Sequence, residues 1–160
     1  REKDLKRERL SAAESVNAIK DRKIDAFFWV GGLPTAAVTD LAATPGIKIK
    51  MIDHAETVTP MNKKYGNLYF KDTIPKATYS GMAGDNQNAS VSNILVVNGK
   101  MSDEEAYKIT KAVFDNKEEL VRTHREYDSV KLENQKAAAT PLPFHPGALK
   151  YFKEKGQNVQ

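Results

Sequence analysis

The residues best suited to bind a ligand lie in one short stretch, Trp-Val-Gly-Gly-Leu-Pro-Thr, from Trp29 to Thr35. Gly31 and Gly32 permit backbone angles that a β-carbon would forbid, and Pro34 suits the first turn of a helix. The first N–H groups of a helix lack intrahelical partners and, with the helix dipole, attract an anion. A carboxylate site and an ordinary tight turn would both use these residues, and spacing alone leaves both interpretations open.

Other kinds of site find less support in the sequence. The chain has no cysteine, and its three histidines are far apart, so we expect neither a metal nor a cofactor. The glycine pair lacks the later glycine or lysine of a dinucleotide or phosphate loop. No serine stands in a nucleophile-elbow context with a partner histidine. His145, placed before Pro146, is expected to cap a helix rather than to contact a ligand.

Composition limits the classes of protein to which the chain can belong. It has 160 residues, 40% hydrophobic and 29% charged, which indicates one globular domain or two small lobes. The net charge is +4, but basic and acidic residues alternate, so no basic stripe for nucleic acid is present. No apolar run reaches the roughly 20 residues of a membrane span.

Hydrophobic patterning predicts a βαβ unit around the glycine pair. The apolar run Ile24–Val30 predicts a strand buried on both faces of a parallel sheet, followed by a helix over 35–43. A strand is expected at Ile47–Met51, and the capping box that Ser11 begins predicts a helix over 12–21.

The second half of the chain is predicted in the same way. A short helix ends at Gly66, a strand covers 68–74 and ends before Pro75, and residues 76–90 form an irregular loop that contains Tyr79. We then expect a strand over 91–97, a turn at Asn98-Gly99, and a long helix over 103–123. A polar helix over 128–139 and a last helix from Pro146 to about Gly156 complete the prediction.

Four segments resemble one family, in the same order. They resemble the carboxyl-terminal half of the extracytoplasmic solute receptors of TAXI type, which serve tripartite ATP-independent periplasmic (TRAP) transporters. The segments are KDRKIDAFFWVGGLPTAAVTDLA, IPKATYSG, ILVVNGKMSDEEAYKITKAVFDN and PFHPGALKYFKEKG. The resemblance implies an α/β, periplasmic-binding-protein-like fold of the second type, with two lobes, of which this chain is the carboxyl-terminal half. Residues 1–88 would finish the second lobe, and residues 89–160 would return to the first.

The resemblance also implies a function. Such receptors are not enzymes; they work outside the cytoplasm, here in the periplasm, and pass a small carboxylate or amino acid such as glutamate or glutamine to TRAP permease subunits. The turn after the first strand would face the ligand, with Tyr79 near the hinge. The predicted ligand contacts are Trp29, Gly31, Gly32, Leu33, Pro34, Thr35 and Tyr79.

Two alternatives remain beside the receptor. An enzyme of similar fold would need a reactive side chain beside the glycine pair, where none is close in sequence. A ligand-free interaction or immunogenic module would need no site. Because the receptors are about twice as long as this chain, part of the cleft and the ligand-gripping loops of their amino-terminal half would be missing, and exposed sheet edges favour self-association.

Overall fold

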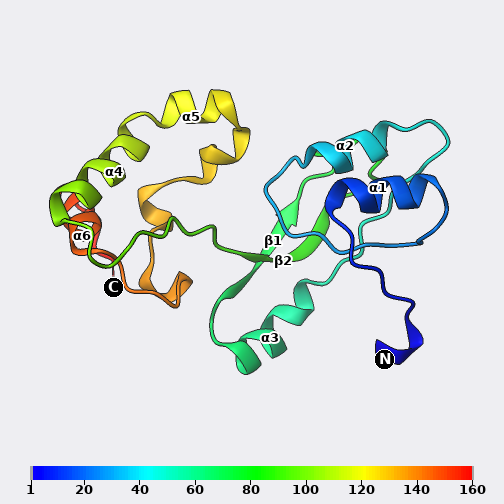
Figure 1. The fold of residues 1–160 in the computed structure, drawn as a ribbon, viewed down its shortest axis with the longest axis horizontal. Helices are drawn as coiled ribbons and strands as arrows, with labels where there is room; N and C mark the ends of the chain where they lie inside the picture. The colour runs from blue at the N-terminus through cyan, green and yellow to red at the C-terminus, as the bar shows by residue number, and fades with distance from the viewer. Residues whose placement is uncertain (1, 160) are drawn as a thin grey trace. The chain divides into compact units, whose positions relative to one another are not determined.

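The computed structural model describes residues 2–159, which form a mixed α/β protein that is mostly helical (Figure 1). Its strands β1 (Tyr69–Ile74) and β2 (Asn86–Val91) make a two-stranded antiparallel sheet. The chain divides into two compact units, Arg1–Met51 with Ile74–Asn86, and Ile52–Thr73 with Gln87–Gln160. The first is called unit 1 and the second unit 2. Among the described helices, none has both the length and the apolar character that crossing a bilayer demands.

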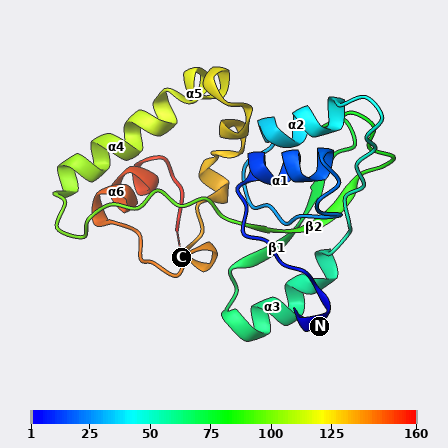
Figure 2. The ribbon, with the colours of Figure 1, turned by 45° about the vertical axis from the view of Figure 1, so that its right-hand side comes forward.

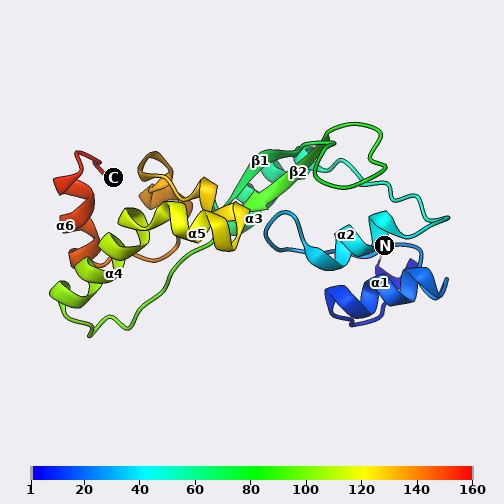
Figure 3. The same cartoon turned by 90° about the horizontal axis from the view of Figure 1, so that it is seen from above.

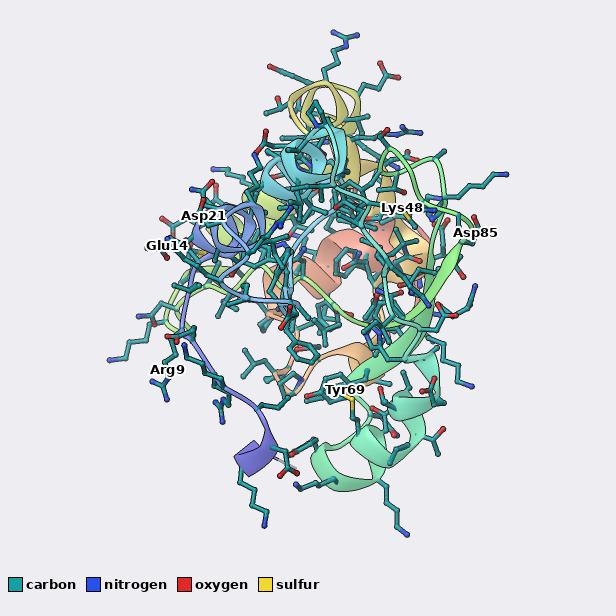
Figure 4. The ribbon with its side chains drawn as sticks, turned by 90° about the vertical axis from the view of Figure 1, so that its right-hand side faces the viewer. Arg9, Glu14, Asp21, Lys48, Tyr69 and Asp85 are labelled. Carbon is teal, nitrogen blue, oxygen red and sulfur yellow. The ribbon has the colours of Figure 1, made fainter. Side chains whose placement is uncertain are left out.

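Unit 1 is built on two helices that lie side by side, α1 (Ala12–Lys20) and α2 (Ala36–Ala43) (Figure 3). The predicted capping box of α1 is confirmed: the Ser11 N–H donates to Glu14 Oε2 at 2.8 Å, and the Glu14 N–H donates to Ser11 Oγ at 3.3 Å. Glu14 thus lies at the start of α1, and Asp21 is the C-cap (both labelled in Figure 4).

The core of unit 1 forms between α2 and the segment after β1. Val38, Ile74 and Tyr79 are buried together. Partly buried apolar side chains pack around them: Phe27, Leu33, Ala42, Ile49, Met51 and Met82. An apolar face of α2 therefore determines where Tyr79 lies.

The predicted parallel sheet of unit 1 is wrong for this structure. Residues 24–30 and 47–51 form no strand. The run 28–30 is exposed instead: Phe28 is 100% exposed and Val30 is 77% exposed. A strand needs a hydrogen-bonded neighbour, and no described segment pairs with either run.

The first α-helix of unit 2 is α3 (Val58–Tyr65), which follows a 3₁₀ turn at Ala55–Thr57 and ends as predicted at Gly66, where φ is 94°. The predicted strand at 68–74 is confirmed as β1. The predictions for the next segments are wrong in part, because β2 starts inside the expected loop and the backbone leaves strand geometry after Val91.

The helices of unit 2 are α4 (Asp103–Asp115), α5 (Lys117–Thr123) and α6 (Pro146–Glu154) (Figure 2). The expected single helix over 103–123 is interrupted at Asn116, whose side-chain amide donates to the Ala112 carbonyl at 2.8 Å. The expected polar helix over 128–139 is also wrong. Residues 125–139 form short 3₁₀ turns, Arg125–Ser129, Leu132–Asn134 and Ala137–Ala139.

α4 and α6 pack closely against each other. Tyr151 and Phe152 of α6 are 2% and 3% exposed, and the Phe114 ring lies 5.7 Å from each of their rings, between centroids. A β-carbon on Gly147 would lie 2.2 Å from the Asp103 carbonyl oxygen, so only glycine allows this crossing. As predicted, His145 caps α6, with Nδ1 accepting from the Gly147 N–H at 3.2 Å.

Candidate functional site

The predicted contact residues converge on Thr35, the N-cap of α2. The Trp29 indole N–H donates to Thr35 Oγ1 at 3.0 Å, and the Thr35 hydroxyl donates to the Gly32 carbonyl at 2.9 Å. The Thr35 N–H donates to the Tyr79 hydroxyl oxygen at 2.9 Å, across 44 residues of sequence. We call these four residues, with Gly31 between them, the Thr35 corner. The structure brings its members together within unit 1.

Gly31 is needed for a reason that the sequence did not reveal. Its φ lies outside the left-handed region, so backbone freedom does not explain the glycine, contrary to our expectation. A β-carbon there would lie 2.7 Å from Trp29 Nε1 and 2.9 Å from two further ring atoms. The absent side chain therefore makes room for the indole, which is how Trp29 reaches Thr35.

The start of α2 has no side-chain cap among the described residues. Threonine at this position commonly accepts a hydrogen bond from an N–H of the first helical turn, but here its hydroxyl is directed to the Gly32 carbonyl. The first turn of α2 also contains no acidic residue. Its N–H groups therefore depend on water or a ligand for a partner.

Leu33 and Pro34 lie in the segment that leads into α2. Leu33 is partly buried and packs against the core of Val38, Ile74 and Tyr79. Pro34 was expected in the first turn, but Thr35 is the N-cap and α2 begins at Ala36, so Pro34 lies before the helix. The Leu33–Pro34 peptide bond is cis. Both residues shape the chain that enters α2.

Burial makes Tyr79 the most constrained member of the Thr35 corner. Its side chain is 3% exposed, whereas Trp29 is 49% exposed. The Tyr79 oxygen accepts from Thr35, and a phenol also has one O–H hydrogen to donate. The corner thus combines neutral donors on a fixed backbone with an indole at the surface.

The shifted pKa values of the chain belong to structural contacts away from this corner. The Ser11 backbone N–H lowers the pKa of Glu14, and the Ser102 hydroxyl lowers the pKa of Glu105, each within a capping box. Lys111 lowers the pKa of Asp115, and burial raises the pKa of Tyr151, whose hydroxyl donates to Asp115 at 3.2 Å. Helix ends and the packing of α4 on α6 account for these shifts.

The histidines serve local structure. His54 Nδ1 lies 2.8 Å from the Ile52 carbonyl oxygen, and His124 Nδ1 accepts from the Glu126 N–H at 3.2 Å. Within residues 2–159, no cluster of three or more His, Cys, Asp or Glu side chains could hold a metal ion.

Two open hollows lie in unit 2, with volumes of about 520 and 490 Å³. Phe114, Asp115 and Lys117 line both of them. Neither hollow is lined by a residue of the Thr35 corner. Trp29 and Gly31 of the corner are exposed, so a ligand held there needs a second wall.

The sequence could not have shown how Val38 and Ile74 fix Tyr79, nor that the Gly32 carbonyl holds the Thr35 hydroxyl. The apolar face of α2 was the one sequence signal for the burial of Tyr79. The hydrogen bond from Thr35 to the Gly32 carbonyl depends on backbone direction, which no residue pattern specifies.

The model of the NMT1-like family matches residues 1–156. The match covers nearly the whole chain, so this protein belongs to the NMT1-like family. That family is related to solute-binding proteins, and most of its members resemble binding proteins.

Proposed function

We propose that this member of the NMT1-like family is part of a TAXI-type extracytoplasmic solute receptor that binds a small carboxylate or amino acid. In this proposal the receptor works in the periplasm and delivers its ligand, similar to glutamate or glutamine, to TRAP permease subunits. Family membership supports a binding protein, and the four ordered segments in the sequence support the TAXI type.

The uncapped start of α2 is the observation that carries the proposal. The Thr35 hydroxyl is held by Gly32 and by Trp29, so it leaves the amides of the first turn to another acceptor. A ligand carboxylate satisfies those amides and lies at the positive end of the helix dipole. A charge-assisted hydrogen bond of this kind contributes about 1.5–3 kcal/mol.

The remaining residues of the Thr35 corner give the ligand its surroundings. The half-exposed indole of Trp29 covers the apolar part of the ligand, and the Tyr79 hydroxyl can turn its hydrogen toward a ligand oxygen. No step of covalent chemistry is involved. Because the corner is open in this structure, capture depends on a second surface that closes over the ligand by a hinge motion.

The exposed apolar run at 28–30 supports self-association of the chain. Phe28 and Val30 lie almost wholly in solvent, and apolar surface of this kind promotes association. The proposal therefore includes self-association of the chain wherever that run is not covered.

Calorimetric titration with glutamate, glutamine and short dicarboxylates tests the function. We expect at least one of them to bind. Thr35→Val removes the hydroxyl that holds the Trp29 indole and the Gly32 carbonyl in place, and it should weaken that ligand about tenfold, which corresponds to about 1.4 kcal/mol. The matched control is Thr44→Val at the other end of α2, where the hydroxyl donates to the Asp40 carbonyl at 2.8 Å. Equal losses of affinity in both variants would show that the Thr35 corner is not part of the binding site. The absence of a binding heat with every carboxylate tested would reject the receptor function.

A further inference from the structure

The turn before α4 exposes an asparagine that is followed by a glycine. Asn98 and Gly99 are both exposed, and the Met101 N–H donates to the Asn98 main-chain carbonyl at 2.9 Å. The Lys100 N–H donates to the side-chain oxygen, Asn98 Oδ1, also at 2.9 Å. The predicted turn at Asn98-Gly99 is thus confirmed, and both oxygens of Asn98 are held within it.

We infer that Asn98–Gly99 is a site of spontaneous covalent modification, at which the chain converts its own amide into a carboxylate. The Gly99 backbone nitrogen gives its proton to solvent and attacks Asn98 Cγ, forming a carbon–nitrogen bond. The side-chain nitrogen takes up a proton and leaves as ammonia, which produces a five-membered cyclic imide. Water then opens the ring at either carbonyl, giving aspartate or isoaspartate, with no change of oxidation state.

The hydrogen bond from Lys100 lies on the atom at which charge develops. When the Gly99 nitrogen attacks, Oδ1 of Asn98 becomes an oxyanion, and the Lys100 N–H already points at that oxygen. Donors placed in advance at such an oxygen lower the barrier to attack on a carbonyl. The turn therefore activates the amide as well as exposing it.

Gly99 leaves the nucleophile accessible. Apart from its two chain neighbours, no described residue has a heavy atom within 4 Å of the position that a β-carbon on Gly99 would take, and its φ lies outside the left-handed region. Ring closure therefore meets no side chain from elsewhere in the described chain. The same fact makes Gly99→Ala a clean variant, because alanine fits without strain and adds only the methyl group that hinders attack.

The modification changes the segment that leads into α4. It converts one neutral amide into a carboxylate, so the formal net charge falls from +4 by one unit to +3. The isoaspartate product also lengthens the backbone by one carbon shortly before Ser102, the N-cap of α4. The inference does not depend on the proposed receptor function.

One internal comparison is available in the same molecule. Asn93 is also exposed, but it precedes Ile94, whose branched side chain shields the backbone nitrogen. Cleavage after lysine releases both asparagines in one peptide, Ala77–Lys100. After incubation of the folded chain at mildly alkaline pH, mass spectrometry of that peptide locates the modified residue.

We expect Asn98 to react at least about tenfold faster than Asn93, a barrier difference of about 1.4 kcal/mol. Gly99→Ala should slow the reaction at Asn98 by a similar factor. Lys100→Pro, which removes the N–H donor, should also slow it, whereas Lys100→Ala, which keeps that N–H, should not. Both substitutions remove the cleavage site after residue 100, so in these variants Asn98 is analysed in the longer peptide Ala77–Lys108. Equal rates at Asn98 and Asn93, or an unchanged rate in Gly99→Ala, would overturn the site. A faster reaction in the unfolded chain than in the folded one would overturn the activating role of Lys100.

Discussion

Tyr79→Phe tests whether the hydrogen bond at Thr35 holds unit 1 together. The substitution removes only the hydroxyl that accepts from the Thr35 N–H at 2.9 Å, and it keeps a ring that is 3% exposed. A buried donor left without a partner costs about 1–3 kcal/mol. Because the Thr35 contact is partly buried, we expect a loss of about 1–2 kcal/mol in the free energy of unfolding.

The assay uses the protein's only tryptophan. Trp29 belongs to the Thr35 corner and donates to Thr35, so its fluorescence reports the unfolding of this part of unit 1. With a urea dependence of about 1–3 kcal/mol per molar, the expected loss moves the urea midpoint down by roughly 0.3–2 M.

Tyr65→Phe is the matched control. Tyr65 is 55% exposed, and its ring contacts Tyr69 and Lys64 in unit 2. The free energy of unfolding of Tyr65→Phe should therefore stay within about 0.5 kcal/mol of the parent value. An unchanged midpoint in Tyr79→Phe would refute the reasoning. The same shift in both variants would show that the hydroxyl at Thr35 has no special role.

Three further predictions follow from the packing and the caps. Gly147→Ala places a β-carbon 2.2 Å from the Asp103 carbonyl and should destabilise unit 2 by about 2–3 kcal/mol, whereas Gly99→Ala should have little effect; similar denaturation midpoints for both would contradict this. Gly31→Ala should displace the half-exposed indole at a cost below about 1 kcal/mol, seen as a shift in Trp29 emission, and an unaltered spectrum would count against the close approach. Glu14 and Glu105 have lowered pKa values, so their stabilisation is complete above the unfolded value of about 4.3 and is lost as pH falls through the folded values. The double variant Glu14→Gln/Glu105→Gln should therefore show a weaker pH dependence of the free energy of unfolding below about pH 4. The same pH dependence in the parent and the variant would contradict the stabilising role of the capping boxes.

Local signals in the sequence predicted several helix ends. The Ser11 capping box, the stop at Gly66 and the His145 cap all appear where expected. Each depends on groups within about four residues of one another, so the sequence contains both partners.

The strands could not be predicted in the same way. The run at 24–30 and the run at 91–97 have strand-like composition, but a strand forms only with a neighbour that may be far along the chain. Phe28 is fully exposed and Leu95 is 71% exposed, which shows that composition alone did not bury them. β2 formed instead from Asn86–Val91, which has weaker strand character but a partner in β1.

The sequence predicted which residues belong to the candidate site, but not how they are arranged. Gly31 to Thr35 are adjacent in sequence, and Tyr79 was added by resemblance to a family. The hydrogen bond from Thr35 to Tyr79 and the indole against Gly31 required coordinates, because both depend on how α2 packs against the segment after β1.

Backbone amide NMR during titration with glutamate tests the binding role of the Thr35 corner most directly. If a carboxylate binds at the start of α2, the largest shifts will map to the amides of Ala36–Val38, with smaller shifts at Gly31, Gly32 and the Trp29 indole. Shifts that cluster instead around Phe114 and Lys117, or a spectrum that stays unchanged at saturating ligand, would contradict the account.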